Sequence, residues 1–424
     1  MTYPIKVTVK QRQHEISAWR RHFHEYPELS KQEFKTMEYI ENILEKEDIF
    51  YHYVEHGGII AWIDGAEKGK TVLLRTDIDA LPIQENQQNL SKTKICKSKI
   101  KGVMHACGHD GHMAMLLEAA KILNEWKQQW KGRVVLLFEE GEEVGGPLAF
   151  LIDYLQHKSG FQIDACYATH VRWDLPSGKI AVVDGYPMAG GFGFQIKLKG
   201  HGGHGSRPDL ANSPIECLHA FYNQIEGLRM RLVPPTEALT FSLGSIHGGI
   251  AHNIIPDEVT FSGTCRFFDY EHAGKPFYEA FFQLLEDTCH EYHCEYKNER
   301  FSKPFYAVQN NKDCVNITRE AVKKYIGDNV LYPSKPWIGS ESFAVLSYLY
   351  PSVLSFTGIQ NLEEGCGANH HSAEFDIDET GLLYGTMACL GFALEFLNDK
   401  HVIGFSPNPL PLENLWERIN SQFN

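Results

Sequence analysis

Short apolar runs alternate with amphipathic stretches along much of the chain. The runs TVLLRTD, RVVLLFEE and ACYATHV, at 71–77, 133–140 and 165–171, have the length and composition of buried strands. Apolar residues at helical spacing lie between them, most clearly over 110–130, and return near 378–398. This alternation predicts an α/β domain with a mostly parallel sheet that is flanked by helices on both faces.

The pattern changes near residue 187. The segment GFQIKLKG, apolar runs at 238–246 and 257–267, and helical patterns near 211–231 and 271–292 predict a smaller α+β unit of ferredoxin-like type. Helix and strand alternation resumes after SKPFYAV. We therefore predict an outer domain formed by residues 1–187 and 304–424, with residues 188–303 inserted as a satellite domain.

Composition limits the classes of partner. The 424 residues are 43% hydrophobic, which is enough for two cores. The formal net charge of -14 argues against nucleic acid and anionic membranes and favours small molecules or cations. The sequence contains neither a signal-peptide pattern nor an apolar run of about 18 residues, so we expect a cytoplasmic protein. Ten scattered cysteines fit buried thiols in a reducing compartment.

The stretch MHACGHDGH, residues 104–112, concentrates side chains that bind metals. It holds one cysteine, one aspartate and three histidines. Alternate side chains of an extended segment share a face, so Cys107 and His109 can point to one place before a helix that begins near Asp110. A helix N-terminus also favours thiolate over thiol. Taken alone, the stretch leaves open a buried cysteine beside a capping residue.

Further acidic and imidazole side chains follow the predicted strands. Glu142 and Glu143 are adjacent after one strand, so one can bind a metal while the other faces the water that the metal activates. The remaining members of the pattern are Asp77, Asp79, His170, His370 and His371. Function collects at the carboxyl ends of parallel strands, and this donor set suits zinc or a similar ion. The sequence therefore predicts a site for a pair of divalent ions.

The ordered series of motifs resembles the amidohydrolase branch of the M20 metallopeptidases, which includes hippurate hydrolase, N-acyl-amino-acid deacetylases and auxin-conjugate hydrolases. The similar stretches run nearly end to end: RRHFHEYPELSKQEF, LLRTDIDALPI, GVMHACGHDGHMAMLLEAAKIL, GEEVGG, THVRWDLPSGKI, GHGGHGSRPDLANSPI, GGIAHNIIPDEVTFSGTCRFFD, GSESF and HHSAEFDIDETGL. The resemblance implies a dimetal amidohydrolase that cleaves an N-acyl amino acid or a short peptide with an activated water.

The resemblance also implies roles for positions of this sequence. Two divalent ions per subunit, zinc or manganese first and nickel or cobalt as alternatives, would be bound by Cys107, His109, Glu143, His170 and His371, with Cys107 as the bridge. Glu142 would be the general base, Asp77 would fix the ring of a ligand histidine, and His204 would stabilise the oxyanion of a partner subunit's site. Asn253 and Arg266 would bind the substrate, with Arg266 on its carboxylate. The satellite domain would act as a lid and join two chains into a homodimer or a larger assembly.

Departures from the family pattern bear on the substrate. Gly141 and VGGP surround the paired glutamates, Ser342 replaces an aspartate, and Gly205, Ser206 and Arg207 follow His204. A dipeptidase, aminopeptidase or carboxypeptidase of the same family is the alternative.

Two rivals belong to other classes. The first is a cysteine hydrolase in which His109 or His112 activates Cys107. The second is a catalytically silent relative that binds a metal or ligand. We interpret His112, three residues after His109, as a supporting or packing residue and not as a ligand.

Overall fold

The structure is a computed structural model that describes residues 2–144, 146–398, 401–407 and 417. The chain divides into two compact units, which are described separately below. The larger unit comprises the segments 1–187, 309–335 and 345–409, and the smaller consists chiefly of 188–308 with the short segment 336–344.

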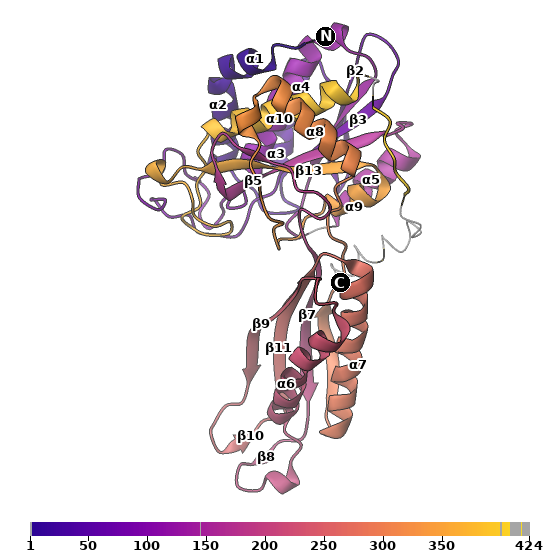
Figure 1. The fold of residues 1–424 in the computed structure, drawn as a ribbon. Helices are drawn as coiled ribbons and strands as arrows, with labels where there is room; N and C mark the ends of the chain where they lie inside the picture. Colours follow the sequence, from indigo (N-terminus) through magenta and orange to yellow (C-terminus); the bar gives the residue numbers. More distant parts are fainter. Residues whose placement is uncertain (1, 145, 399–400, 408–416, 418–424) are drawn as a thin grey trace. The chain divides into compact units, whose positions relative to one another are not determined.

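The larger unit is built on a seven-stranded sheet with the order β1-β2-β4-β3-β5-β13-β6 (Figure 1). Its four central strands are parallel: β4 (Arg133–Glu139), β3 (Thr71–Asp77), β5 (Ala165–Pro176) and β13 (Ser352–Gln360). Antiparallel strands flank them: β2 (Gly58–Asp64) and then the edge strand β1 (Phe50–Val54) on one side, and the edge strand β6 (Ile180–Ala181) on the other. The central strands are buried on both faces, which explains their continuous apolar runs. The predicted mostly parallel α/β sheet is confirmed.

Helices cover this sheet. One face packs against α1 (Ile5–Gln11), α2 (Gln13–Glu25), α3 (Phe34–Lys46), α4 (His109–Glu125), α8 (Lys312–Tyr325) and α10 (Thr380–Phe396), whose buried side chains share one core with Val72 and Leu136. The helix α5 (Pro147–His157) packs against β2 and β4, and α9 spans Ala344–Leu349. Because α10 is packed against α4, α8 and β13, it is apolar around nearly its whole circumference.

The smaller unit has its own four-stranded antiparallel sheet, with the order β12-β7-β11-β9. The chain order is β7 (Gly190–Lys199), α6 (Pro214–Leu232), β9 (Leu239–Gly248), β11 (Glu258–Phe267), α7 (Lys275–Glu291) and β12 (Glu295–Phe301). This β-α-β-β-α-β sequence is the predicted ferredoxin-like arrangement. Phe221 of α6 and Phe281 of α7 pack against Phe194 and Phe261 of the sheet.

Two short strands extend the smaller unit. The strands β8 (Gly203–His204) and β10 (Ile254–Ile255) pair with each other beyond the end of the main sheet where β7 stops and β11 begins (Figure 1). The predicted helix at 271–292 divides into a π-helical turn, Tyr270–Gly274, followed by α7.

The chain leaves and re-enters the larger unit at neighbouring positions. The backbone N–H of Asn310 donates to the carbonyl oxygen of Gly185 at 2.7 Å, in an antiparallel bridge. The side chain of Asn310 also bonds the carbonyl oxygens of Val183 and Leu354. Among the described residues, no helix has the length and apolar character needed to cross a membrane.

Candidate metal centre

The ends of three neighbouring parallel strands converge on one site. Asp77 ends β3, His170 lies on β5, and Glu142 and Glu143 follow β4 after a short turn. The helix α4 begins at His109, directly after Gly108. Gly108 has φ 92°, and a Cβ atom there would lie 2.3 Å from Cγ2 of Val171. Glycine therefore lets the start of α4 approach β5 closely.

All five predicted ligands lie together. Side-chain donor atoms within 4.8 Å of one another form the groups Cys107–His109–His170, Cys107–Glu143–His371 and His109–Glu142–Glu143. Cys107 Sγ is 3.6 Å from His170 Nε2, and Glu143 Oε1 is 3.2 Å from His371 Nε2. Because Cys107 belongs to the first two groups, its sulfur lies where it could bridge two ions.

Hydrogen bonds to Nδ1 determine the tautomer of two histidine rings. His109 Nδ1 lies 3.0 Å from Asp79 Oδ1, and His170 Nδ1 lies 2.6 Å from the carbonyl oxygen of Val171. Each contact places the proton on Nδ1 and leaves the lone pair on Nε2. His109 Nε2 is buried and has no hydrogen-bond partner within the described residues. A buried nitrogen, a thiol and a carboxylate that converge in this way fit a borderline divalent ion.

His112 is oriented differently. Its Nδ1 is 2.7 Å from Asp77 Oδ1, and its Nε2 accepts the backbone N–H of Val171 at 2.8 Å. Both ring nitrogens are thus engaged within the protein, which supports the interpretation of His112 as a supporting residue.

The hydrogen bond expected from Asp77 to a ligand histidine is made by Asp79. Asp77 Oδ1 lies 3.8 Å from His109 Nδ1, beyond hydrogen-bond distance. Asp79 bonds His109 through Oδ1, and its Oδ2 accepts from Ser30 Oγ at 2.7 Å and from the backbone N–H of Glu143 at 3.0 Å. The role of Asp79 was not predicted, although its position two residues after Asp77, at the end of β3, places both side chains on the same face.

The charges around the site disfavour a free cysteine nucleophile. Burial and the neighbouring carboxylate of Glu143 raise the pKa of the Cys107 thiol well above its ordinary value. Reactive cysteines instead need a lowered pKa. A divalent ion would supply the positive charge that a Cys107 thiolate requires.

His371 reaches the site from a distant part of the sequence. It lies in the segment between β13 and α10, and its backbone N–H donates to the carbonyl oxygen of Ala106 at 2.9 Å. Its φ of 60° is unusual for a residue other than glycine. This backbone contact places the ring of His371 beside Cys107.

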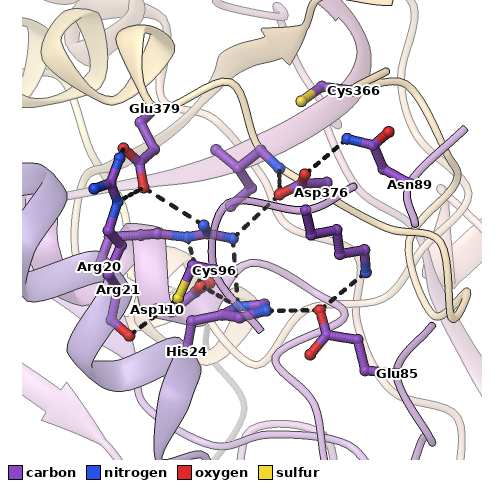
Figure 2. A network of polar contacts seen from close by, with 12 residues as sticks. Arg20, Arg21, His24, Glu85, Asn89, Cys96, Asp110, Cys366, Asp376 and Glu379 are labelled. Carbon is purple, nitrogen blue, oxygen red and sulfur yellow. Dashed lines mark hydrogen bonds and ion pairs between the residues drawn. The ribbon is translucent and has the colours of Figure 1, made fainter. Parts of the chain in front are cut away.

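A buried ionic network, shown in Figure 2, lies beside the start of α4. Arg20 Nε and His24 Nδ1 contact Asp110 Oδ2 at 2.9 and 2.7 Å. His24 Nε2 and Lys94 Nζ contact Glu85 at 3.0 and 2.9 Å. Arg20 also lies 3.6 Å from carboxylates of Asp376 and Glu379, which follow His371 in sequence. The network connects the two segments that carry His109 and His371, and the sequence analysis did not predict it.

The predicted residues of the smaller unit fall into two places. His204 is exposed on β8, and its Nδ1 accepts from the backbone N–H of Ser206 at 3.1 Å, so its proton is on Nε2. Asn253 immediately precedes β10, and its carbonyl oxygen accepts from Gly205 at 2.8 Å. Arg266 lies near the other end of β11, paired with Gly191 of β7.

Arg266 is partly buried and is held by neutral groups. Its Nη1 donates to Thr264 Oγ1 and to the carbonyl oxygen of Cys265. Within the part of the chain that the structure describes, no carboxylate forms an ion pair with Arg266. Burial lowers its pKa from the ordinary value. Such a guanidinium is available for an anionic group of a ligand.

An α/β sheet with a mixed sulfur, nitrogen and oxygen donor set at its strand ends, and a second carboxylate beside it, defines a metal-dependent hydrolase. The sequence profile of peptidase family M20/M25/M40 matches residues 73–394. The chain belongs to this family, as its motifs predicted.

Curated relatives cover nearly the whole chain. Thermostable carboxypeptidase 1 of Saccharolobus solfataricus is 34% identical over 395 residues, which are 91% of this chain and 97% of the relative. N-acetyl-L-cysteine deacetylase of Bacillus subtilis is 33% identical over 382 residues, which are 90% of this chain and 87% of the relative. Both peptidase and amidohydrolase names therefore occur among its relatives.

Solved structures show the same fold. A putative aminohydrolase from methicillin resistant Staphylococcus aureus has a TM-score of 0.82 and 30% identity, covering 94% of this chain and 100% of that one. The Bacillus subtilis YXEP protein, described as a dinuclear metal binding peptidase of the M20 family, has a TM-score of 0.73 and 29% identity, covering 92% of this chain and 99% of that one.

Proposed function

We propose that the protein uses two divalent ions to hydrolyse the amide bond between an acyl group and an amino acid whose α-carboxylate is free. The observation that carries this proposal is the sharing of Cys107 by two ligand groups, with Glu142 close to the donor atoms of His109 and Glu143. The ligands are Cys107, His109, Glu143, His170 and His371, and the ions are zinc or manganese, with nickel or cobalt as alternatives.

Bound there, the ions would supply Lewis acidity toward a water molecule and the amide carbonyl. Glu142 takes the proton from the attacking water and returns it to the leaving amine nitrogen. His204 donates from Nε2 to the oxygen that becomes negative, because its Nδ1 already accepts from Ser206. Asp79 and Asp77 hold the rings of His109 and His112.

The proposed substrate class is defined by the amine product that leaves when the amide bond is cleaved. A deacetylase of N-acyl amino acids and a carboxypeptidase both release an amino acid with a free carboxylate. Arg266, which has no carboxylate partner in the described residues, can bind that group through two parallel hydrogen bonds. Peptides with a free C-terminus are therefore the second candidate substrates, favoured by the carboxypeptidase relative.

The smaller unit favours a site shared between two chains. Arg266 of β11 pairs with Gly191 of β7 at one end of the sheet. At the other end, near β8, Glu258 of β11 pairs with Lys199 of β7. Eight steps of about 3.3 Å along β11 separate these ends by roughly 26 Å. One small substrate cannot span that distance, so His204 and Asn253 would act with the Arg266 of a second subunit.

An exposed edge of the smaller unit's sheet offers a place where two subunits could pair. The edge strand β9 has solvent-exposed alternate residues, including Ile246, and the following segment carries Ile250 with 91% exposure. The exposed side of α6 adds Tyr222 and Met230. Unpaired strand edges and apolar patches of this kind are typical of interfaces. We propose a homodimer, and cytoplasmic location fits its ten free, buried cysteines.

The test combines metal analysis with substrate release. Protein purified without chelator should contain two divalent ions per chain, and chelation should abolish activity until zinc, manganese, nickel or cobalt is restored. Amino acid release should then be measured from N-acyl amino acids, from their carboxamides and from short peptides. Activity that survives complete removal of metal would support the cysteine hydrolase, and bound metal without turnover of any amide would support a silent relative.

A further inference from the structure

An N-terminal segment, residues 28–33, lies beside the turn that carries the two glutamates. The backbone N–H of Ala80 donates to the carbonyl oxygen of Glu28 at 2.8 Å, and Leu29 pairs with Ala80 in a parallel bridge. Ser30 Oγ donates to Asp79 Oδ2, which also accepts the backbone N–H of Glu143. The segment is therefore attached to the supporting carboxylate of the site.

Glu33 makes a second attachment. Its side chain is fully buried, and its Oε1 accepts the backbone N–H of Gly141 at 2.7 Å. Gly141 has φ 65°, and a Cβ atom there would lie 2.8 Å from Cγ of Pro147. The backbone directly before Glu142 is thus held in a left-handed conformation by one carboxyl oxygen and by close packing. We name residues 140–143 the glutamate turn.

The surroundings of Glu33 favour its neutral form. Burial and the charges of Asp79 and Glu140 raise the pKa of Glu33 to about 8, against the opposing effect of the Gly141 hydrogen bond. Burial raises the pKa of Glu140, while His56 and Lys31 act to lower it. Within the described residues, Glu33 Oε2 has no hydrogen-bond partner. A neutral acid still accepts the Gly141 N–H through Oε1, without adding a charge beside Asp79.

We propose that Glu33 is a positioning residue for the glutamate turn: its buried carboxyl group fixes Gly141, and through it the directions of Glu142 and Glu143. The roles of Glu142 and Glu143 rest on the proposed function. The contacts that hold the turn do not depend on it.

Two variants separate the hydrogen bond from the volume of the side chain. Glu33→Gln keeps an oxygen acceptor and remains neutral, so metal content and kcat should stay within about twofold of the parent. Glu33→Met keeps the length but has only a weak acceptor. Its kcat should fall roughly 10- to 100-fold, the size expected for misplaced reacting groups, while KM changes less. Its metal content should also fall because Glu143 is displaced.

Hydrogen exchange supplies a readout that needs no turnover. In the holoenzyme, peptides covering residues 139–143 should exchange faster in Glu33→Met than in the parent, and at the parent rate in Glu33→Gln. A matched control is Glu118→Gln in α4. Glu118 is equally buried, burial and Glu15 raise its pKa to about 8, and its ion-pair contact is with Arg12 at 3.7 Å. This control should change neither exchange in the turn nor kcat.

The pH dependence of stability tests the neutral form. A carboxyl group whose pKa rises from 4.5 to about 8 on folding favours the folded chain at low pH and loses that contribution as the pH rises to about 8. Glu33→Gln removes this loss, so its melting temperature relative to the parent should be higher at pH 9 than at pH 6. If the melting temperatures of Glu33→Gln and the parent differ by the same amount at pH 6 and pH 9, Glu33 is not neutral in the folded chain.

Other outcomes overturn the positioning role. Native exchange and full metal content in Glu33→Met would do so, as would a Glu33→Gln variant that loses metal and kcat. If Glu33→Met does not fold, the Glu33→Gln results decide. Should the parent cleave no amide, the proposed function fails, while the exchange and metal measurements still decide the role of Glu33.

Discussion

Glu142 and Glu143 are neighbours in sequence but have different expected tasks. Glu142→Gln removes the base and keeps the shape, so metal should stay bound while kcat falls by about 10² or more. Glu143→Gln should lose metal, because Oε1 of Glu143 lies 3.2 Å from His371 Nε2 and belongs to the same group of donor atoms. Metal content and turnover of both variants check the assignment. Equal metal loss in the two would contradict it.

Arg266 is expected to recognise the free carboxylate. Arg266→Lys keeps the charge but loses the planar fork, so kcat/KM should fall by about tenfold or more on N-acyl amino acids and much less on their carboxamides. Kinetics on matched acid and amide pairs measure this difference. Equal losses on both would make Arg266 a structural residue.

Single residues also show how far sequence reasoning extends. The resemblance of the motifs to the M20 family predicted the ligand positions, and the structure brings all of them together. His170, which the sequence placed at the end of a strand, lies within β5. Which aspartate holds which histidine was not predictable, because Asp77 and Asp79 share a face and the choice depends on how α4 lies above β3. The left-handed backbone of His371 has no signal in its sequence.

At the scale of elements, the buried strands were the easiest to predict. β3, β4 and β5 are continuous apolar runs, and their starts match the predicted ones. The edge strand β1, its neighbour β2 and the strand β12 were not predicted. Phe50, Tyr51 and His52 of β1, for example, mix aromatic and polar residues on an exposed edge, where burial imposes no clear alternation.

The ionic network between α2 and α4 predicts a pH-dependent stability. Burial and Arg20 lower the pKa of His24, but Asp110 and Glu85 outweigh them and hold it above the ordinary value. The protonated ring therefore stabilises the fold at low pH, and this contribution is lost as the pH rises through the raised pKa. His24→Gln should lower the melting temperature more at pH 6 than at pH 9.

Thermal melts of His24→Gln and of the parent at both pH values measure this effect. His157→Gln, at an exposed position of α5, is the control and should change little at either pH. A larger destabilisation at pH 9 would mean that His24 acts as a neutral ring.

At the scale of the whole molecule, subunit exchange tests the shared site. His204→Ala and Glu142→Gln should each be inactive alone. After exchange of subunits, a hybrid dimer has one site with Glu142 from one chain and His204 from the other, so activity should return to at most about a quarter of the parent value for random mixing. Mass spectrometry of labelled chains verifies the exchange. No recovery despite exchange would mean that His204 acts within its own chain or has no catalytic role.

Gly185 pairs with Asn310, so the inserted segment begins and ends at adjacent points of the larger unit. We call the larger unit the host and the inserted segment the guest. Because the guest starts and ends at adjacent points, its replacement leaves the continuity of the host sheet intact. The segment 336–344 groups with the guest, and a new guest would have to match it. Under the roles proposed for Arg266 and His204, exchange of the guest during evolution would change substrate preference and assembly together, and a new guest would have to supply its own oxyanion donor in place of His204.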